Sequence, residues 1–204
     1  MIYQQTSRYL LKTYRNVIAG TAQASEHNLT LSYLAQYLQN PKARCPATTP
    51  TDFLNPEVVL SAFGFRAAYS IAKIADQIDH QGRSWNDALV DLHRISRAHC
   101  QYFIVRTFFT ALQRDNKDNT LGTAERKVLQ AVASLFALHV MEKDLSDFVL
   151  CSYFSAEQLE MIKQQVQDLL KVIRPDAVSL VDAFAIPDYM LHSALGRYDG
   201  NVVS

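Results

Sequence analysis

The apolar residues of this chain recur every three or four positions along almost its whole length. Such spacing lines one face of an α-helix, whereas a half-buried strand alternates at every second position. Within residues 55–82, for example, one apolar stripe runs through Leu60, Phe63, Ala67 and Ile71. No segment combines sustained two-residue alternation with flanking turn residues. The pattern therefore predicts an all-α fold, arranged as an antiparallel helical bundle.

Local start and stop signals divide this pattern into separate helices. Asn55 can accept hydrogen bonds from free amides at a helix start, and Pro56 fits the first turn. Gly20 and Gly82 are favourable stops for the helices that precede them. The predicted helices are residues 2–18, a short helix at 31–38, a long helix from Asn55 to Gly82, a helix from the cap Ser84 to about Arg114, one carrying Val128, Val132, Leu135 and His139 on a single face, one opened by the capping box Ser155 to Gln158, and, after an interruption at Pro175, a last stretch from Asp176 to Phe184.

One segment interrupts the helical pattern. Residues 19–54 are polar and contain Pro41, Pro46 and Pro50, which predicts an irregular connection apart from the short helix already mentioned. This connection divides the chain into residues 1–18 and residues 55–204.

Charge and cysteine content exclude several classes of protein. Twenty basic residues balance twenty acidic ones, so the chain has no cationic surplus for binding nucleic acid. Cys45, Cys100 and Cys151 are too dispersed for a zinc site and suit a reducing compartment. No apolar run approaches the roughly 20 residues that cross a bilayer. The N-terminus does not resemble a signal peptide, and the C-terminal Asn-Val-Val-Ser is not a peroxisomal address of the Ser-Lys-Leu type.

Few residues stand out as candidates for chemistry. The chain lacks a phosphate-binding Gly-rich loop, a G-x-S-x-G motif and an H-E-x-x-H motif. His99 and Tyr102 could contact a subunit or cofactor, although a core histidine with locally satisfied nitrogens is the commoner case. Arg66 is expected to pack its stem and extend its guanidinium outward, with a charged partner as the alternative, and Arg66, Arg197 and Asp199 are further candidates for contacts at an interface. For Arg197 and Asp199, local ion pairs and capping are favoured over acid–base work.

Several motifs in a fixed order resemble the C-terminal part of acyl-CoA oxidases. The N-terminal segment QTSRYLLK (residues 5–12) is similar to the helix that follows this family's catalytic-base motif. The similarity extends over nearly the whole chain and is weakest in the connection at 19–54. The segments that resemble the family are FRAA (65–68), ALVDL (88–92), SRAHC (96–100), IRPDAV (173–178), LVDAF (180–184) and SALGRYDGNV (193–202).

This resemblance implies an activity, a cofactor and a cellular location. Members of the family oxidise an acyl-CoA to the trans-2-enoyl-CoA with FAD as hydride acceptor, and oxygen then yields hydrogen peroxide. The family resemblance also implies a homodimer and a peroxisomal location. It assigns residues 1–18 to the end of the flavin-proximal helical domain and residues 55–204 to the C-terminal oxidase domain.

The resemblance also implies that the catalytic part lies elsewhere. In the family, the base is a glutamate in a Tyr-Glu-Gly-Asp-Asn type of motif shortly before the position of Gln5, and this chain has only four residues ahead of Gln5. We therefore expect no catalytic base, no FAD held by this chain alone, and acyl-CoA contacts only through regions outside it. The expected role is scaffold and dimerisation. Two alternatives remain open, a non-catalytic interaction module and a small carrier of acyl-CoA or lipid.

Overall fold

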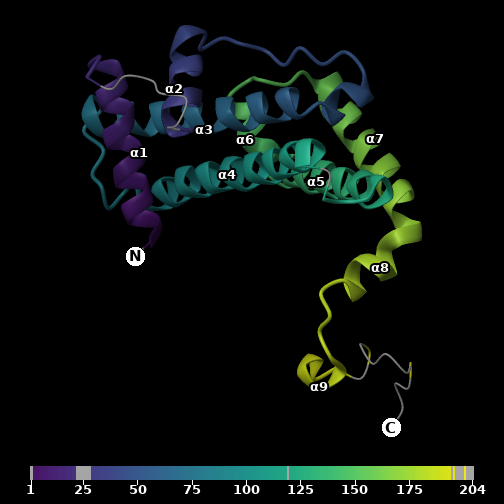
Figure 1. Cartoon of the computed structure of the whole chain (residues 1–204). Coiled ribbons are helices and arrows are strands. Elements are labelled where there is room, and N and C mark those ends of the chain that lie inside the picture. The colour runs from purple at the N-terminus through teal and green to yellow at the C-terminus, as the bar shows by residue number, and fades with distance from the viewer. Residues whose placement is uncertain (1, 22–28, 119, 194, 196–199, 201–204) are drawn as a thin grey trace.

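The computed structural model describes residues 2–21, 29–118, 120–193, 195 and 200, and among these it contains helices and no strands, as the sequence predicts (Figure 1). The all-α fold class is confirmed. The elements are α1 (Ile2–Ile18), α2 (Leu29–Gln39), the short 3-10 helix η1 (Pro50–Leu54), α3 (Pro56–Asp79), α4 (Leu89–Asp118), α5 (Thr123–Lys143), α6 (Leu145–Leu150), α7 (Ala156–Ile173), the 3-10 turn η2 (Arg174–Asp176), α8 (Ala177–Asp182) and α9 (Asp188–Leu191).

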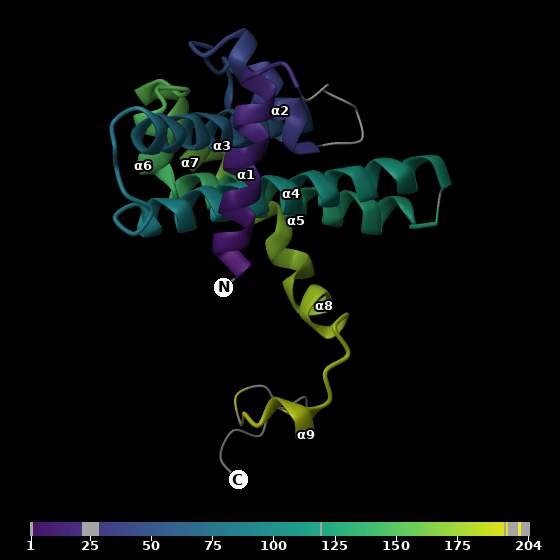
Figure 2. The same cartoon turned by 90° about the vertical axis from the view of Figure 1, so that its left-hand side faces the viewer.

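Three long helices form the centre of the molecule. α3, α4 and α5 follow one another with reversed direction, and α5 lies alongside α4 in both views (Figures 1 and 2). Helix α1 crosses α4 at one end of this group, whereas α7 packs on α5 at the other end. Helix α2 packs on α3. The antiparallel arrangement therefore holds for the central helices, and α1 adds a crossing layer.

Two of the expected helix boundaries form as predicted, the start at Asn55 and the stop at Gly20. The side chain of Asn55 accepts a hydrogen bond from the Glu57 amide at 2.9 Å, and Pro56 occupies the first turn of α3. At the end of α1, Gly20 has a φ of 68°, and the amide of Thr21 donates to the Asn16 carbonyl at 3.0 Å. A left-handed residue at this point lets the chain turn back over the last carbonyls of the helix.

The capping box at Ser155 and Gln158 also ties two distant segments together. Ser155 accepts from the Gln158 amide at 3.2 Å, and the Gln158 side chain accepts from the Ser155 amide at 3.0 Å. The side-chain nitrogen of Gln158 donates to the carbonyls of Cys45 and Ala47 at 2.9 and 2.8 Å. The start of α7 thus holds the irregular connection against the bundle.

Three details of the predicted helices were wrong. Ser84 closes a turn with Asp87, because its hydroxyl accepts from the Asp87 amide at 3.2 Å, and α4 begins later, at Leu89. The helix expected to end at about Arg114 continues to Asp118, and in the segment beyond it the Leu121 amide donates to the Asp115 carboxylate at 3.0 Å. His139 is exposed. The buried face of α5 is formed instead by Ala133, Ser134, Ala137, Leu138, Val140 and Met141.

The apolar core is centred on aromatic side chains contributed by elements far apart in the sequence. Phe148 of α6 packs edge-on against Phe63 of α3, with ring centroids 6.0 Å apart, and stacks on Phe154 at 5.1 Å. Phe53 of η1 completes the group through Phe154 at 5.9 Å. Because all four rings are buried, this cluster fixes the positions of α3, α6 and η1 relative to one another.

One helix satisfies the length and composition of a membrane span, contrary to the expectation from the sequence. An 18-residue window of α3 has a mean hydropathy of 1.3. However, 61% of that window is buried inside the protein, and the core helix of a soluble protein passes the same test. Packing against α2, α4 and the aromatic cluster accounts for the apolar composition of α3.

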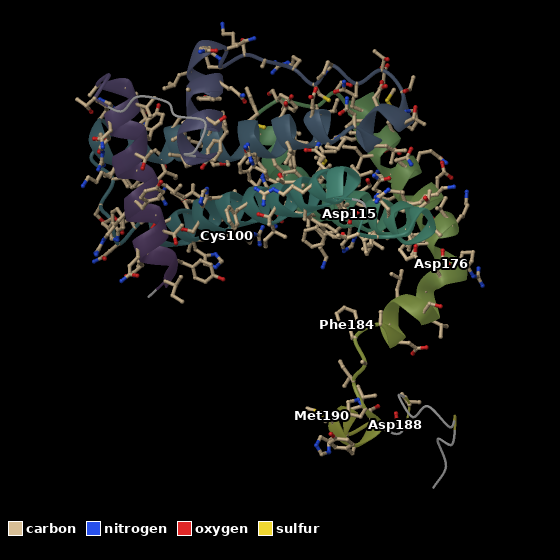
Figure 3. The ribbon with its side chains drawn as sticks, in the orientation of Figure 1. Cys100, Asp115, Asp176, Phe184, Asp188 and Met190 are labelled. Carbon is tan, nitrogen blue, oxygen red and sulfur yellow. The ribbon has the colours of Figure 1, made fainter. Side chains whose placement is uncertain are left out.

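The end of the chain leaves the bundle. Pro175 lies within η2, so α7 stops at Ile173 and a separate helix, α8, follows. From there α8 and α9 descend away from α4 and α5 (Figure 1), and Phe184, Asp188 and Met190 are labelled along this path in Figure 3. Residues 177–191 are hereafter called the C-terminal arm.

Candidate functional site

His99 and Tyr102 are brought together by a third residue, Tyr33. The hydroxyl of Tyr33 lies 3.0 Å from Nδ1 of His99, and the rings of Tyr33 and Tyr102 meet edge-on with centroids 5.0 Å apart. Arg106, one turn further along α4, donates to the hydroxyl of Tyr102 at 3.0 Å. Tyr33 belongs to α2 and was missed at the sequence level, because nothing near it in the sequence indicates its partners.

A glycine in α3 allows Tyr33 to reach this position. A Cβ atom added to Gly64 would lie 3.0 Å from the Cβ of Tyr33 and 3.5 Å from a ring carbon of Tyr102. The first of these distances is tighter than a normal van der Waals contact. Glycine therefore permits α2 to approach α3 closely enough for Tyr33 to contact α4.

Burial fixes the protonation of this group. Loss of solvent raises the pKa of Tyr33 well above its ordinary value, so its phenol keeps its proton. Burial also lowers the pKa of His99 below 6.5, which favours the neutral imidazole. A neutral phenol can donate its hydrogen to an unprotonated Nδ1. The arrangement is that of a half-buried histidine whose Nδ1 has a hydrogen-bond partner within the protein.

We expect the pH dependence of stability to report this histidine. In the unfolded chain His99 gains a proton near pH 6.5, whereas in the folded chain it does so only at lower pH. Its contribution to the free energy of unfolding is therefore present above pH 6.5 and is lost as the pH falls through the folded pKa. Urea unfolding of the native chain and of His99→Gln, at about pH 5.5 and about pH 7.5, should show a smaller acid loss in the variant.

A matched substitution controls for this effect. His139 is an exposed histidine of α5, so His139→Gln removes an imidazole from the surface and is the matched control. An identical acid loss in the native chain and in His99→Gln would contradict the assignment of a lowered pKa to His99.

Beside this cluster, α1 and α4 enclose an open hollow of about 640 Å³. Most of its lining is apolar, and Phe103 and Ile104, which the helical pattern places next to His99, are each half exposed. We call this surface the α1–α4 face. Its lining includes Gln5, Tyr9, His99, Cys100, Phe103 and Ile104.

Arg66 lies in a different place and in a different state from the one expected. Its guanidinium does not extend outward, because the side chain is 0% exposed and lies between the rings of Phe63 and Phe148, 5.2 and 4.8 Å from their centroids. It donates to Asp144 at 3.2 Å and to Gln101 at 2.5 Å. Burial lowers the pKa of Arg66, and the Asp144 carboxylate opposes that shift.

Asp144 is the centre of this buried network. It also accepts from Gln101 at 2.8 Å and from Arg97 at 2.5 Å, so one carboxylate serves two cations and an amide. The network joins α3, α4 and the corner between α5 and α6. Nε of Arg66 is buried and makes no hydrogen bond within the described part of the chain. This arrangement holds α3, α4 and the α5–α6 corner together through interior hydrogen bonds.

The remaining candidates do not add to a site. Arg197 and Asp199 lie outside the residues that the structure describes. Among residues 2–21, 29–118 and 120–193, no three His, Cys, Asp or Glu side chains are close enough to hold a metal ion. Cys45 and Cys151 are buried, and burial raises the pKa of the Cys151 thiol to about 11, whereas Cys100 is exposed on the α1–α4 face.

Comparison with known proteins decides the family. The sequence model described as acyl-CoA oxidase matches residues 55–203. This chain belongs to the acyl-CoA oxidase family. The resemblance carried by its motifs is thereby confirmed.

The relatives agree in sequence and in structure. Peroxisomal acyl-coenzyme A oxidase 1 of Arabidopsis thaliana is 33% identical over 201 residues, which are 97% of this chain and 29% of the relative. The human peroxisomal acyl-coenzyme A oxidase 1 is also 33% identical, over 97% of this chain and 30% of its own length. The solved structure of Arabidopsis thaliana acyl-CoA oxidase 1 superposes with a TM-score of 0.87 at 32% identity, covering 98% of this chain and 30% of that one. The chain therefore spans about 30% of the length of these relatives.

A structure with lower sequence identity to this chain was solved with bound ligands. Acyl-CoA oxidase-1 of Caenorhabditis elegans, solved with FAD and ATP, superposes with a TM-score of 0.79 at 27% identity over 100% of this chain and 30% of its own. The helical arrangement seen here is therefore shared by oxidases from a plant and an animal.

Proposed function

We propose that this chain is the C-terminal helical part of a peroxisomal, FAD-dependent acyl-CoA oxidase, in which it acts as scaffold and dimerisation region without supplying the catalytic base. The observation that carries the proposal is the match of nearly the entire chain to less than a third of each oxidase relative. The peroxisomal location follows from the names of those relatives.

Among the described residues, the two largest hollows do not fit the cofactor. FAD supplies the hydride acceptor when bound, and its diphosphate needs cations or free amides at helix starts. The hollow at the α1–α4 face has no lysine or arginine in its lining, and a second hollow, between α4, α5 and α7, offers Lys127 with Asp168 nearby. Neither donor set suits a flavin dinucleotide. We therefore assign no step of the oxidation to this chain.

The buried network supports a scaffold role. Arg66, Asp144 and Gln101 hold helices in register through interior hydrogen bonds, which is a structural rather than a catalytic use of charge. The α1–α4 face and the C-terminal arm present apolar side chains to solvent, which is typical of surfaces that another part of an assembly covers.

Purification of the chain tests the proposal directly. We expect a colourless, stable dimer by light scattering that retains no flavin after incubation with FAD and releases no hydrogen peroxide from an acyl-CoA. A yellow protein that forms peroxide would contradict the non-catalytic assignment. A strictly monomeric chain at every concentration would contradict the dimerisation role.

One observation favours the carrier alternative. The hollow between α4, α5 and α7 has a volume of about 410 Å³, within the range of ligand sites, and Phe109, Leu112 and Leu169 line it. Its polar lining includes Lys127, which could pair with an anionic group. Saturable binding of acyl-CoA to the purified chain without FAD, abolished by Leu112→Asp, would support this second function.

A further inference from the structure

The hollow between α4, α5 and α7 has a buried floor and an exposed rim. It lies where α7 packs on α5 (Figure 1) and holds about 410 Å³, far more than the roughly 30 Å³ that one water occupies in the liquid. It therefore has room for a small molecule. Lys127 and Gln130 are exposed at its rim. The lining residues that form its floor are between 4% and 6% exposed and are Phe109, Leu112, Ser134, Gln165 and Leu169.

Two polar side chains of this floor have no partner in the protein. Neither the hydroxyl of Ser134 nor the side-chain amide of Gln165 makes a hydrogen bond within the described part of the chain. Among the described residues, only Nε of Arg66 is sealed from solvent without a partner, so the polar atoms of Ser134 and Gln165 keep some exposure. Because both side chains line the hollow, this exposure is toward the hollow.

Other buried serines of this chain are satisfied by the helix that carries them. The hydroxyls of Ser7 and Ser96 donate to carbonyls one turn back, those of Tyr3 and Leu92, at 2.9 and 3.0 Å. A serine inside a helix can always form such a bond, and Ser134 does not. Since buried polar groups are ordinarily paired, the two polar groups of the floor call for a partner that the chain itself does not supply.

The lining selects the charge of that partner. Lys127 and Asp168 are the charged residues of the lining, and Lys127 is exposed. The Asp168 carboxylate already accepts from Lys171 at 2.9 Å. No charge lies on the floor, so burial of an ionised group there would be costly. A hydroxyl and an amide each donate and accept, which matches an uncharged head group that does the same.

We propose that this hollow binds an uncharged amide or alcohol with a short apolar body. The head group exchanges hydrogen bonds with Ser134 and Gln165, and the body packs against Phe109, Leu112 and Leu169. The inference goes beyond the scaffold role and does not depend on it. It also differs from the acyl-CoA carrier, in which an anion would lie at Lys127 and hydrocarbon would cover the polar floor, leaving both groups without partners.

Titration with octanamide tests the proposal. We expect saturable binding to the purified chain by isothermal titration calorimetry, at least tenfold tighter than the binding of octanoate at pH 8, because a carboxylate would bring a charge to an uncharged floor. Gln165→Leu and Ser134→Ala should each weaken octanamide binding about fivefold, through the loss of a hydrogen bond. Gln167→Leu, which replaces an exposed glutamine of the same helix, is the matched control and should bind like the native chain.

Thermal unfolding provides a second readout. Ser134 makes no hydrogen bond within the described chain, so Ser134→Ala should unfold at the native temperature or above it. Ser96→Ala loses bonds to the carbonyls of Tyr3 and Leu92 and should unfold at a lower temperature. An equal fall in both variants would mean that Ser134 is already satisfied, and would overturn the proposal.

Other outcomes of the titration would overturn it as well. Octanamide that fails to bind, or that binds equally well to the native chain, Gln165→Leu and Ser134→Ala, would mean that water satisfies the floor. Tighter binding of octanoate would place an anion at Lys127 instead. A chain that binds octanamide as expected but never dimerises would contradict the scaffold and dimerisation role alone.

Discussion

Replacement of Asp144 by alanine is expected to lower the free energy of unfolding by about 3–5 kcal/mol, because it leaves the cation of Arg66 buried without its counter-charge. The side chain of Arg66 is 0% exposed and that of Asp144 is 10% exposed, so water cannot replace the lost carboxylate. Gln101 would remain as a neutral partner of Arg66. For a chain of this size, thermal unfolding should occur roughly 10 °C lower, which calorimetry or circular dichroism can measure.

Two further variants show whether the burial of charge is the cause. Asp168→Ala removes an exposed carboxylate that pairs with Lys171, and such pairs are worth less than about 1 kcal/mol. Arg66→Met replaces the buried cation with an apolar group, and Asp144 keeps Arg97 and Gln101, so the loss should be clearly smaller than in Asp144→Ala. Equal losses in Asp144→Ala and Asp168→Ala would refute this account of the network.

Truncation of Phe148 to alanine should cost about 3–5 kcal/mol, since it opens a cavity at the centre of the aromatic cluster. The Phe148 ring is buried, packs against Phe63 and Phe154, and lies under the guanidinium of Arg66. Loss of the ring therefore removes both apolar contacts and the cation–π attraction that helps to hold Arg66 in the interior. Urea unfolding followed by tryptophan fluorescence would measure the change.

The matched control for this truncation lies in the C-terminal arm. Phe184 is 74% exposed, so Phe184→Ala should change the free energy of unfolding by less than about 0.5 kcal/mol in dilute, monomeric samples. Phe148→Leu should fall between the two, because leucine refills part of the space. If Phe148→Ala and Phe184→Ala were equally stable, the cluster would not be the core that its burial indicates.

The sequence predicted those features of the fold that depend on neighbouring residues. The Asn55 cap, the glycine stop at Gly20 and the capping box at Ser155 are interactions within one turn of a helix, and all three were correct. The predicted start of a helix was wrong where the capping side chain can cap either a helix or a turn that precedes it. Ser84, for example, caps a turn with Asp87 before α4 begins.

The candidate site depended on contacts between distant residues, and these were not predicted. Arg66 meets an aspartate 78 positions away, and His99 meets a tyrosine 66 positions away. The spacing of residues around Asp144 and Tyr33 does not indicate that either of them contacts Arg66 or His99. Arg66 therefore looked like a surface residue with a packed stem, because the periodic pattern gives the face of a residue and not the charge opposite it. The family, in contrast, was predictable, since ordered motifs carry it.

The two bonds from Gln158 to the connection bear on the order of assembly. The side chain that caps α7 reaches carbonyls 113 and 111 positions earlier in the sequence. Until residues 45–47 have arrived, the Gln158 side chain lacks two of its hydrogen-bond partners, and until α7 has formed, the carbonyls of Cys45 and Ala47 lack the amide that donates to them. Loop closure over such a separation is slow relative to helix formation. The connection and the last long helix therefore form one cooperative unit, in which protection of their amides from exchange with solvent rises and falls together.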